Sequence, residues 1–259
     1  MQNSFNFFVY ILVLGFFVIF SGICQAGTDL VYQQANMDEV KVRRNITYKT
    51  EQGKGLMLDV YYSLEKAPVT KGHTVVLVHG RGPESSYKDT ALYNSWGRLM
   101  AVNGFNAVTF NWRPSYSPDD ITDLSTYIRA NAEELKINGN SISFFVFSLG
   151  VKDGVREALL ADQGFIKSII VYYGRIDQSI LELITDKEFP PFLIVMAAKD
   201  RMIPVNANDD FINQLKKRGS RIEKIVHSSG QHGFELYNDN QETYEIIEKT
   251  IDFIKKTSK

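Results

Sequence analysis

Cysteine and net charge are both scarce in this 259-residue sequence. Its single cysteine, Cys24, excludes a disulfide framework, and a chain without the first 26 residues has no thiol to serve as nucleophile or metal ligand. Lys and Arg together number 29 and Asp and Glu number 30, which gives a formal net charge of -1. Nucleic-acid binding is therefore not expected, since there is no basic excess to neutralise phosphates.

Two motifs for bound cofactors are missing as well. The sequence has no H-E-x-x-H segment and no cluster among its four histidines, so no metal site is expected. No G-x-G-x-x-G segment follows the first buried strand, so a dinucleotide is not expected either. We therefore predict that the protein acts without a cofactor.

The first 26 residues carry no charged side chain. Residues 7–20 form an apolar run of signal-peptide length, and Cys24-Gln25-Ala26 places small residues where a signal peptidase cuts. We predict a signal peptide at residues 1–26, export to the periplasm or the medium, and a single mature domain at residues 27–259. Because no Lys or Arg precedes the apolar run, an uncleaved anchor at residues 5–23 is the alternative, and it is the only membrane contact expected.

The mature region alternates short apolar runs with amphipathic segments. Runs without polar alternation indicate strands buried on both faces, as in a parallel sheet covered by helices. Two further strands, at 40–48 and 56–63, flank a glycine turn and predict an antiparallel hairpin. Buried strands are predicted at 74–78, 107–111, 141–147, 168–173, 192–197 and 222–226, and helices at 88–103, 119–137, 149–163, 180–185, 205–218 and 241–256. This order predicts an α/β fold, a three-layer α/β/α sandwich.

Polar side chains follow three of the predicted strands. Ser148 follows the strand at 141–147, Asp200 follows the strand at 192–197, and His232 lies in the loop after the last strand. Ligands bind at the carboxyl ends of parallel strands. A serine at a strand-to-helix turn presents its hydroxyl above the sheet, a histidine can take its proton, and a carboxylate can orient that histidine. We predict that these three residues form a catalytic triad.

Four short motifs carry a resemblance to a known family. They are Leu77-Val78-His79-Gly80, Ser148-Leu149-Gly150, Ala198-Lys199-Asp200-Arg201-Met202-Ile203-Pro204 and Gln231-His232-Gly233-Phe234. With the order Ser, Asp, His along the chain, the sequence resembles the α/β-hydrolase superfamily, in particular its compact dienelactone-hydrolase-like and small esterase members. The resemblance covers about residues 40–257. It implies a mostly parallel eight-stranded sheet with little or no lid, and a serine hydrolase that cleaves carboxylic esters through an acyl-enzyme.

The resemblance also assigns roles to individual residues. It favours Asp200 over Asp177 as the triad acid, because Asp200 lies in the matching loop. It implies an oxyanion hole formed by the backbone N–H groups of Arg81 and Leu149. His79 belongs to the first motif and is expected to be structural.

The nucleophile turn departs from the family's G-x-S-x-G pattern. Val146 stands where glycine is expected, and Val151 stands where another small residue is common. Larger side chains at this turn crowd the strand against the following helix, which strains the backbone. One alternative to an esterase is therefore a catalytically impaired binding protein of the same fold. Another is a thioesterase or peptidase that uses the same triad.

Arginine and aromatic residues also follow the predicted strands. Guanidinium groups at this rim can bind an anionic group of a small-molecule ester substrate, and surface salt bridges are the competing interpretation. The four arginines are Arg81, Arg113, Arg175 and Arg201, and their candidate salt-bridge partners are Glu84, Asp119, Asp177 and Asp200. The predicted substrate pocket consists of Trp112, Arg113, Tyr116, Tyr173 and Arg175.

Overall fold

A computed structural model describes most of the chain after residue 28. The described residues are 29–51, 53–64, 72–81, 87–113, 119–161, 163–184 and 188–258. The predicted signal peptide or anchor lies outside them. Within these ranges, no helix has the length and apolar character needed to cross a membrane.

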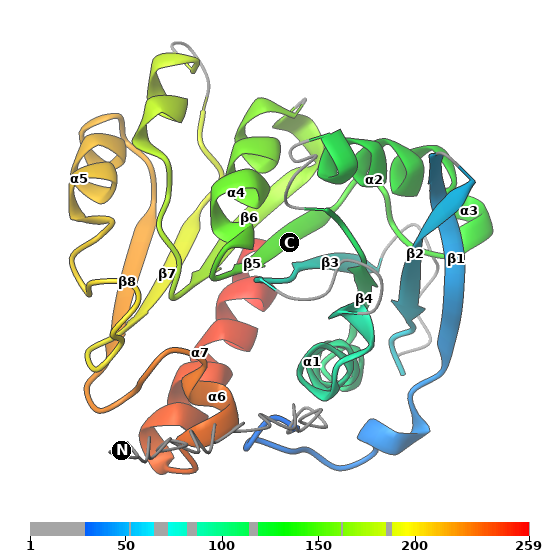
Figure 1. The fold of residues 1–259 in the computed structure, drawn as a ribbon, viewed down its shortest axis with the longest axis horizontal. Coiled ribbons are helices and arrows are strands. Elements are labelled where there is room, and N and C mark those ends of the chain that lie inside the picture. Colours follow the sequence, from blue (N-terminus) through cyan, green and yellow to red (C-terminus); the bar gives the residue numbers. More distant parts are fainter. Residues whose placement is uncertain are drawn as a thin grey trace, which may run out of the picture.

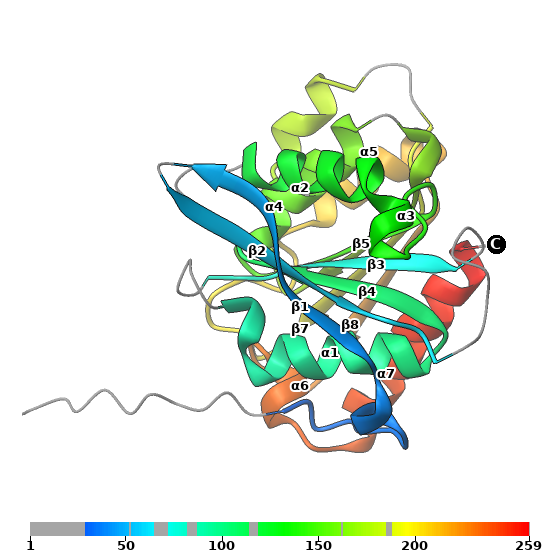
Figure 2. The same ribbon diagram turned by 90° about the vertical axis from the view of Figure 1, so that its right-hand side faces the viewer.

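An eight-stranded sheet lies between two layers of helices (Figure 1, Figure 2). The spatial order is β1-β2-β4-β3-β5-β6-β7-β8. The β1–β2 and β2–β4 pairs are antiparallel, and the other five pairs are parallel. The strands are β1 Val42–Glu51, β2 Lys54–Tyr61, β3 His73–Val78, β4 Phe105–Phe110, β5 Ile142–Phe147, β6 Ile166–Tyr172, β7 Phe192–Ala197 and β8 Ile222–His227. The predicted α/β fold with a mostly parallel eight-stranded sheet is confirmed.

Helices cover both faces of the sheet, and each face has its own apolar core. The first core contains Val155 of α4 and the second contains Trp96 of α1. Helices α2, α3, α4 and α5 lie on one face and α1, α6 and α7 on the other (Figure 2). The helices are α1 Ala91–Val102, α2 Asp119–Ala130, α3 Ala132–Leu135, α4 Gly150–Leu160, α5 Asp209–Lys217, α6 Phe234–Tyr237 and α7 Gln241–Thr257. The 3-10 helices are η1 Met37–Glu39, η2 Tyr87–Asp89, η4 Gln163–Phe165 and η5 Gln178–Glu182.

The burial of the central strands explains their apolar sequences. Every residue of β3, β4, β5 and β7 is buried. A strand covered by helices on both faces has no solvent side on which polar residues could alternate. The edge strand β8 is partly exposed along its length, which agrees with its more polar sequence.

The predicted helices differ from the structure at several points. The short helix expected at 180–185 is the 3-10 helix η5, and the helix expected at 205–218 begins at Asp209. The helix expected at 119–137 is two helices, α2 and α3, separated at Asn131, whose φ is -110°. The helix expected at 88–103 starts as η2 and continues as α1. Helix α6 was not predicted, because four residues are too few to show a helical period.

The direction of strand addition reverses at β3. Strand β4 lies on one side of β3 and β5 lies on the other. At such a point the connections leave toward opposite faces of the sheet, and a crevice opens at the carboxyl ends of the strands. The loop after β3 carries Gly80 and Arg81, and the turn after β5 carries Ser148. Both motifs therefore reach this crevice.

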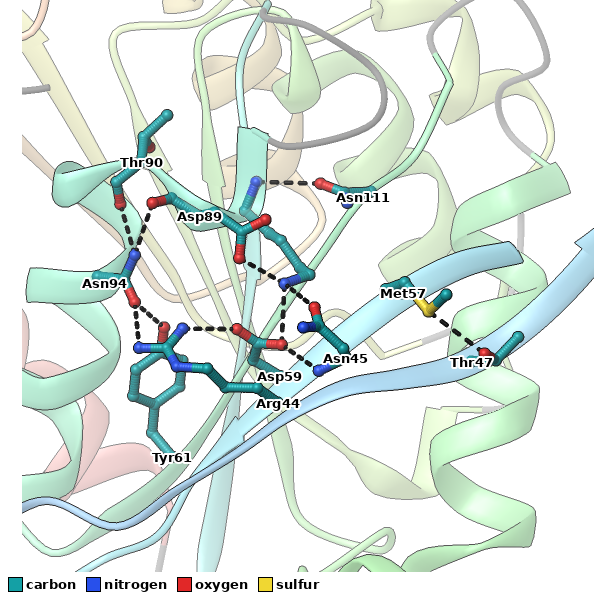
Figure 3. A network of polar contacts seen from close by, with 11 residues as sticks. Arg44, Asn45, Thr47, Met57, Asp59, Tyr61, Asp89, Thr90, Asn94 and Asn111 are labelled. Carbon is teal, nitrogen blue, oxygen red and sulfur yellow. Dashed lines mark hydrogen bonds and ion pairs between the residues drawn. The ribbon is translucent and has the colours of Figure 1, made fainter. Parts of the chain in front are cut away.

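A buried charge network joins the β1–β2 hairpin to η2 (Figure 3). The side chain of Lys88 is only 1% exposed, and its Nζ lies 2.9 Å from Oδ1 of the fully buried Asp59 and 2.5 Å from Oδ1 of Asp89. Arg44 pairs with the other Asp59 oxygen at 2.9 Å. Removing one partner of a buried ion pair leaves an uncompensated charge. The network therefore holds η2, including Tyr87, at a fixed place relative to β2.

Candidate active site

Ser148 occupies a sharp turn between β5 and α4. Its φ of 48° is left-handed, which is uncommon outside glycine. Its N–H donates to the carbonyl of Tyr172 at 3.0 Å, and its own carbonyl accepts from the N–H of Val151 at 3.1 Å. A Cβ added to Gly150 would lie 2.4 Å from the carbonyl oxygen of His79. Glycine at this position therefore lets α4 begin close to the end of β3.

The two valines of the turn pack against glycines on neighbouring segments. A Cβ added to Gly154, one turn into α4, would lie 2.5 Å from Cγ1 of Val146. A Cβ added to Gly174, after β6, would lie 2.2 Å from Cγ2 of Val151. The family pattern provides space with small residues inside the turn, whereas this chain provides it with glycines opposite the valines. Val146 is thus accommodated without opening the turn.

Three predicted side chains meet in a hydrogen-bonded row. Oγ of Ser148 lies 2.9 Å from Nε2 of His232, and Nδ1 of His232 lies 2.8 Å from Oδ2 of Asp200. The Asp200 side chain is fully buried, and 22% of the His232 side chain is exposed. Oδ1 of Asp200 accepts the N–H groups of Met202 and Ile203 at 2.7 and 3.0 Å. The carboxylate can therefore orient the imidazole, and the imidazole can take the serine proton.

A second serine–histidine contact lies at the amino ends of the strands. His73, the first residue of β3, contacts the hydroxyls of Ser141 and Ser143 at 2.8 Å each. Burial lowers the pKa of His73 to about 3, which keeps the ring neutral. Ser143 is fully buried, and His73 forms no ion pair with any described carboxylate. This pair is a packing contact without access for a substrate.

The other two histidines are buried as well. Burial lowers the pKa of His79 to about 4, and its Nδ1 lies 2.8 Å from the Gly80 carbonyl. Nε2 of His227 contacts the Thr243 hydroxyl at 2.8 Å, and Nδ1 lies 3.0 Å from a carboxylate oxygen of Glu242. Among the described residues, no three His, Cys, Asp or Glu side chains are grouped to hold a metal ion.

Two of the predicted pocket residues border hollows at Ser148. Arg175 lines a hollow of about 770 Å³, here called the large hollow, and Tyr173 lines one of about 310 Å³, the small hollow. The prediction was wrong for Trp112, which is fully buried and whose indole N–H donates to the carbonyl of His79 at 3.3 Å. Its ring belongs to the core beneath the site.

Arg113, also predicted as a pocket residue, lines neither hollow and is held by carboxylates instead. Its guanidinium donates to both carboxylate oxygens of Asp120 at 2.8 and 2.7 Å and pairs with Glu51 at 2.5 Å. The salt-bridge interpretation thus holds for this arginine, with Asp120 in place of Asp119. Tyr116 and Glu84 lie outside the described residues.

The remaining three arginines lie at the rim of the site. Arg81 borders both hollows together with Ser148. Arg201 borders a third hollow of about 870 Å³ beside Asp200. None of the three guanidinium groups forms a salt bridge with a described residue, which removes Asp177 and Asp200 as their partners. Leu149 directly precedes α4 and also borders the large hollow.

Several residues around the hollows were not predicted. One of them, Lys152, has a signal in the sequence, because it lies in the first turn of the helix that follows Ser148. The others come from helices and loops whose position depends on tertiary packing. They are Tyr87, Leu92, Tyr93, Ile176, Met202, Ile203, Ala207, Leu236 and Tyr237.

A buried carboxyl lies behind the histidine. Glu235 is fully buried, and burial raises its pKa to about 7. The hydroxyl of Tyr173 donates to Oε1 of Glu235. The Tyr173 ring centre lies 4.6 Å from that of His232. Glu235 therefore fixes the tyrosine that forms one wall of the histidine site.

Comparisons with known proteins identify a family and a shared fold. The Dienelactone hydrolase family matches residues 122–257. No curated protein matches the chain. Among solved structures, Thermogutta terrifontis esterase 2 phosphonylated by cyclosarin is 18% identical with a TM-score of 0.66, covering 84% of this chain and 92% of its own. The propionate-bound form of the same esterase is 18% identical with a TM-score of 0.65, covering 84% and 95%. Likeness at this identity shows a shared fold.

The packing of Val146 predicts the effect of a methyl group on the facing helix. Gly154→Ala places a Cβ against the valine, and we expect a loss of about 1–3 kcal/mol in the free energy of unfolding. Val146→Ala in the same chain should restore most of it. Gly164→Ala is the matched control, because a Cβ there meets no atom within 4 Å. Urea unfolding measures all four proteins, and a Gly154→Ala protein as stable as the control would contradict the packing.

The environment of Glu235 predicts a pH dependence of stability. Between its ordinary pKa of 4.5 and about 7, the folded state holds a proton that the unfolded chain releases, so stability falls as pH rises. The loss is at most about 3 kcal/mol above pH 7. Glu235→Gln should remove this slope, whereas Glu223→Gln, at an exposed position, should keep it. Urea midpoints at pH 5 to 8 measure the slope, and equal slopes in both variants would refute the assignment.

Proposed function

The chain is a hydrolase that belongs to the dienelactone hydrolase family, and from this premise we propose that it cleaves carboxylic esters with Ser148 as the nucleophile. His232 accepts the serine proton as Oγ attacks the ester carbonyl. The same proton passes to the alcohol oxygen as the carbon–oxygen bond breaks. Water then attacks the acyl-enzyme with His232 as the base, and the acid leaves.

The observation that carries this proposal is the row Ser148–His232–Asp200. Each contact has hydrogen-bond length, at 2.9 and 2.8 Å. Because Asp200 is buried and two backbone N–H groups occupy its other oxygen, its position is fixed. The imidazole keeps Nδ1 toward the carboxylate and Nε2 toward the hydroxyl. The second serine–histidine contact, at His73, lacks a carboxylate partner among the described residues and lacks access.

The proposed oxyanion hole lies beside this row. The backbone N–H of Leu149 at the start of α4 and the N–H of Arg81 after β3 are the proposed donors. The N–H of Gly80 is occupied, because it donates to the Tyr93 hydroxyl at 2.9 Å. The first residue of that loop with an available donor is therefore Arg81.

Three cations favour esters with an anionic group. Arg81, Lys152 and Arg175 all border the large hollow together with Ser148. Asp177 is the only described acidic residue on its border, so the balance there is positive. A carboxylate on the substrate can offset this charge through a hydrogen-bonded ion pair.

Covalent labelling tests the nucleophile. A fluorophosphonate probe should label the protein, and Ser148→Ala should abolish labelling and lower kcat for short-chain nitrophenyl esters by about 10⁴-fold or more. Ser143→Ala is the matched control and should keep both activities, provided that it folds like the wild type by circular dichroism. A well-folded wild type that neither takes the probe nor hydrolyses the esters would identify the catalytically impaired binding protein.

A panel of matched esters, thioesters and amides separates an esterase from a thioesterase or peptidase. Faster cleavage of the thioesters or the amides than of the esters would reject the ester assignment.

Removing one positive charge from the large hollow tests the preference for an anionic substrate. Arg175→Ala should raise KM about tenfold for an ester that carries a carboxylate and leave KM for its neutral isostere within about twofold. Arg221→Ala is the control, because the side chain of Arg221 is 55% exposed and borders neither hollow. It should leave the KM of both esters unchanged. An unchanged ratio between the two esters in Arg175→Ala would reject the anionic preference.

A further inference from the structure

Two hollows of different size and chemistry meet at Ser148. The small hollow measures about 310 Å³ and the large hollow about 770 Å³. Both are bordered by Ser148, Arg81 and Met202. An ester bound at Ser148 extends on two sides of its carbonyl carbon, so each side must enter a different space.

The small hollow has an aromatic and aliphatic wall. Tyr87, Leu92, Tyr93, Tyr173, Leu236 and Tyr237 border it. The hydroxyls of two of these tyrosines are engaged inside the protein, Tyr93 with the Gly80 N–H and Tyr173 with Glu235. Tyr93 and Tyr173 therefore present their aromatic rings to a ligand, and an aromatic surface suits an uncharged group.

The large hollow differs in charge as well as size. Besides Arg81, Lys152 and Arg175, its border includes the aliphatic side chains of Ile176 and Ile203. It is open toward α4 and η5, whereas the small hollow lies toward α1 and α6. The two spaces thus lie toward opposite faces of the sheet.

The position of His232 gives the substrate a direction. His232 borders the small hollow and the third hollow and does not border the large one, whereas Leu149 borders the large one and not the small one. Ser148 borders the small hollow and not the third, so the small hollow is the space that the two residues share. In acyl transfer the alcohol oxygen must receive a proton from the histidine as it leaves. The alcohol side of the ester therefore has to lie on the histidine side of Ser148.

We propose that the small hollow receives the alcohol part of the ester and the large hollow receives the acyl part. This assignment rests on the proposed function of Ser148. The bond from Oγ of Ser148 to the acyl carbon forms in the large hollow, and the bond from that carbon to the alcohol oxygen breaks. The alcohol leaves through the small hollow with the proton from His232. The substrate class is an ester of a short or single-ring uncharged alcohol with a larger acid.

The assignment has a kinetic consequence. Once the alcohol has left, every ester of one acid yields the same acyl-enzyme. A change in the small hollow therefore alters acylation to an extent that depends on the alcohol, whereas its effect on the deacylation rate constant of a given acyl group is the same for every alcohol. A change in the large hollow affects both steps, because the acyl group stays there until water releases it.

Two isomeric esters provide the test. Benzyl acetate carries its ring on the alcohol side, and methyl phenylacetate carries it on the acyl side. Leu236→Trp narrows the small hollow and should lower kcat/KM at least tenfold for benzyl acetate and less than twofold for methyl phenylacetate. Ala207→Phe narrows the large hollow and should do the reverse. Leu183→Ala, which is 63% exposed and borders neither hollow, should change neither value.

Two further measurements keep the test decisive. Tyr237 is 53% exposed, so Tyr237→Ala will fold where a larger change does not, and it should lower kcat/KM for benzyl acetate alone. Stopped-flow measurements on Leu236→Trp with acetate esters of two alcohols should show burst rates that fall by different factors for the two alcohols, and one shared steady-phase rate where deacylation limits turnover.

The opposite results overturn the assignment. If the small-hollow variants impair methyl phenylacetate instead, or both isomers equally, the orientation is wrong although the protein is an esterase. If the wild type neither takes the fluorophosphonate probe nor hydrolyses either isomer, the proposed function fails and the assignment fails with it. The two failures are distinguished by the wild-type activity.

Discussion

The close approach of the Gly150 backbone to the carbonyl of His79 is the contact on which the site depends. It brings the start of α4 against the end of β3, at the place where the order of strands reverses. Ser148 is held there with a left-handed φ of 48°, which lifts its side chain out of the sheet toward His232. Such backbone conformations cost free energy and persist only where the surrounding packing fixes them. The strands on both sides of β5, each buried along its length or nearly so, provide that packing.

The two valines at the nucleophile turn show why the G-x-S-x-G pattern has small residues: the backbone of the turn needs space on both sides. A turn between a strand and a helix needs room on both of its flanks, and a small residue on either of two facing segments can provide it. Here Gly154 faces Val146 and Gly174 faces Val151. The space is therefore provided by a valine and a glycine together, and not by one position alone. In a close-packed interior, an extra methyl group at either position of such a pair is destabilising. A departure from the pattern at Val146 is therefore weak evidence against a formed turn.

The sequence predicts those parts of the site that follow directly from strand order. Buried strands reveal themselves as apolar runs, and the residues after them must lie at one edge, so Ser148, Asp200 and Arg175 could be placed. The direction of a side chain after a strand could not. Trp112 turns into the core and Arg113 is held by Asp120, a residue that itself becomes buried only in the folded chain. Apart from Tyr173, the wall of the small hollow comes from α1, η2 and α6, whose approach to Ser148 depends on tertiary contacts. One of these contacts is the ion pair between Lys88 and Asp59, which lie 29 residues apart in the sequence. No local sequence pattern predicts that these two side chains form a pair.

The histidine site is built from two carboxyl groups in contrasting surroundings. Asp200 accepts two backbone N–H groups and contacts the imidazole of His232. Glu235 receives one phenol hydroxyl inside an aromatic core, and burial raises its pKa to about 7. Below pH 7 burial favours the protonated, uncharged form of Glu235, and Asp200 is the described carboxyl group that contacts His232. The imidazole ring is held in one orientation, with Nδ1 toward Asp200 and Nε2 toward Ser148. The small hollow beside Tyr173 is bordered by the cation Arg81, which it shares with the large hollow, whereas Lys152 and Arg175 border the large hollow and not the small one. In the assignment that we propose, an uncharged alcohol therefore lies on the histidine side and the charged groups of a substrate lie on the other.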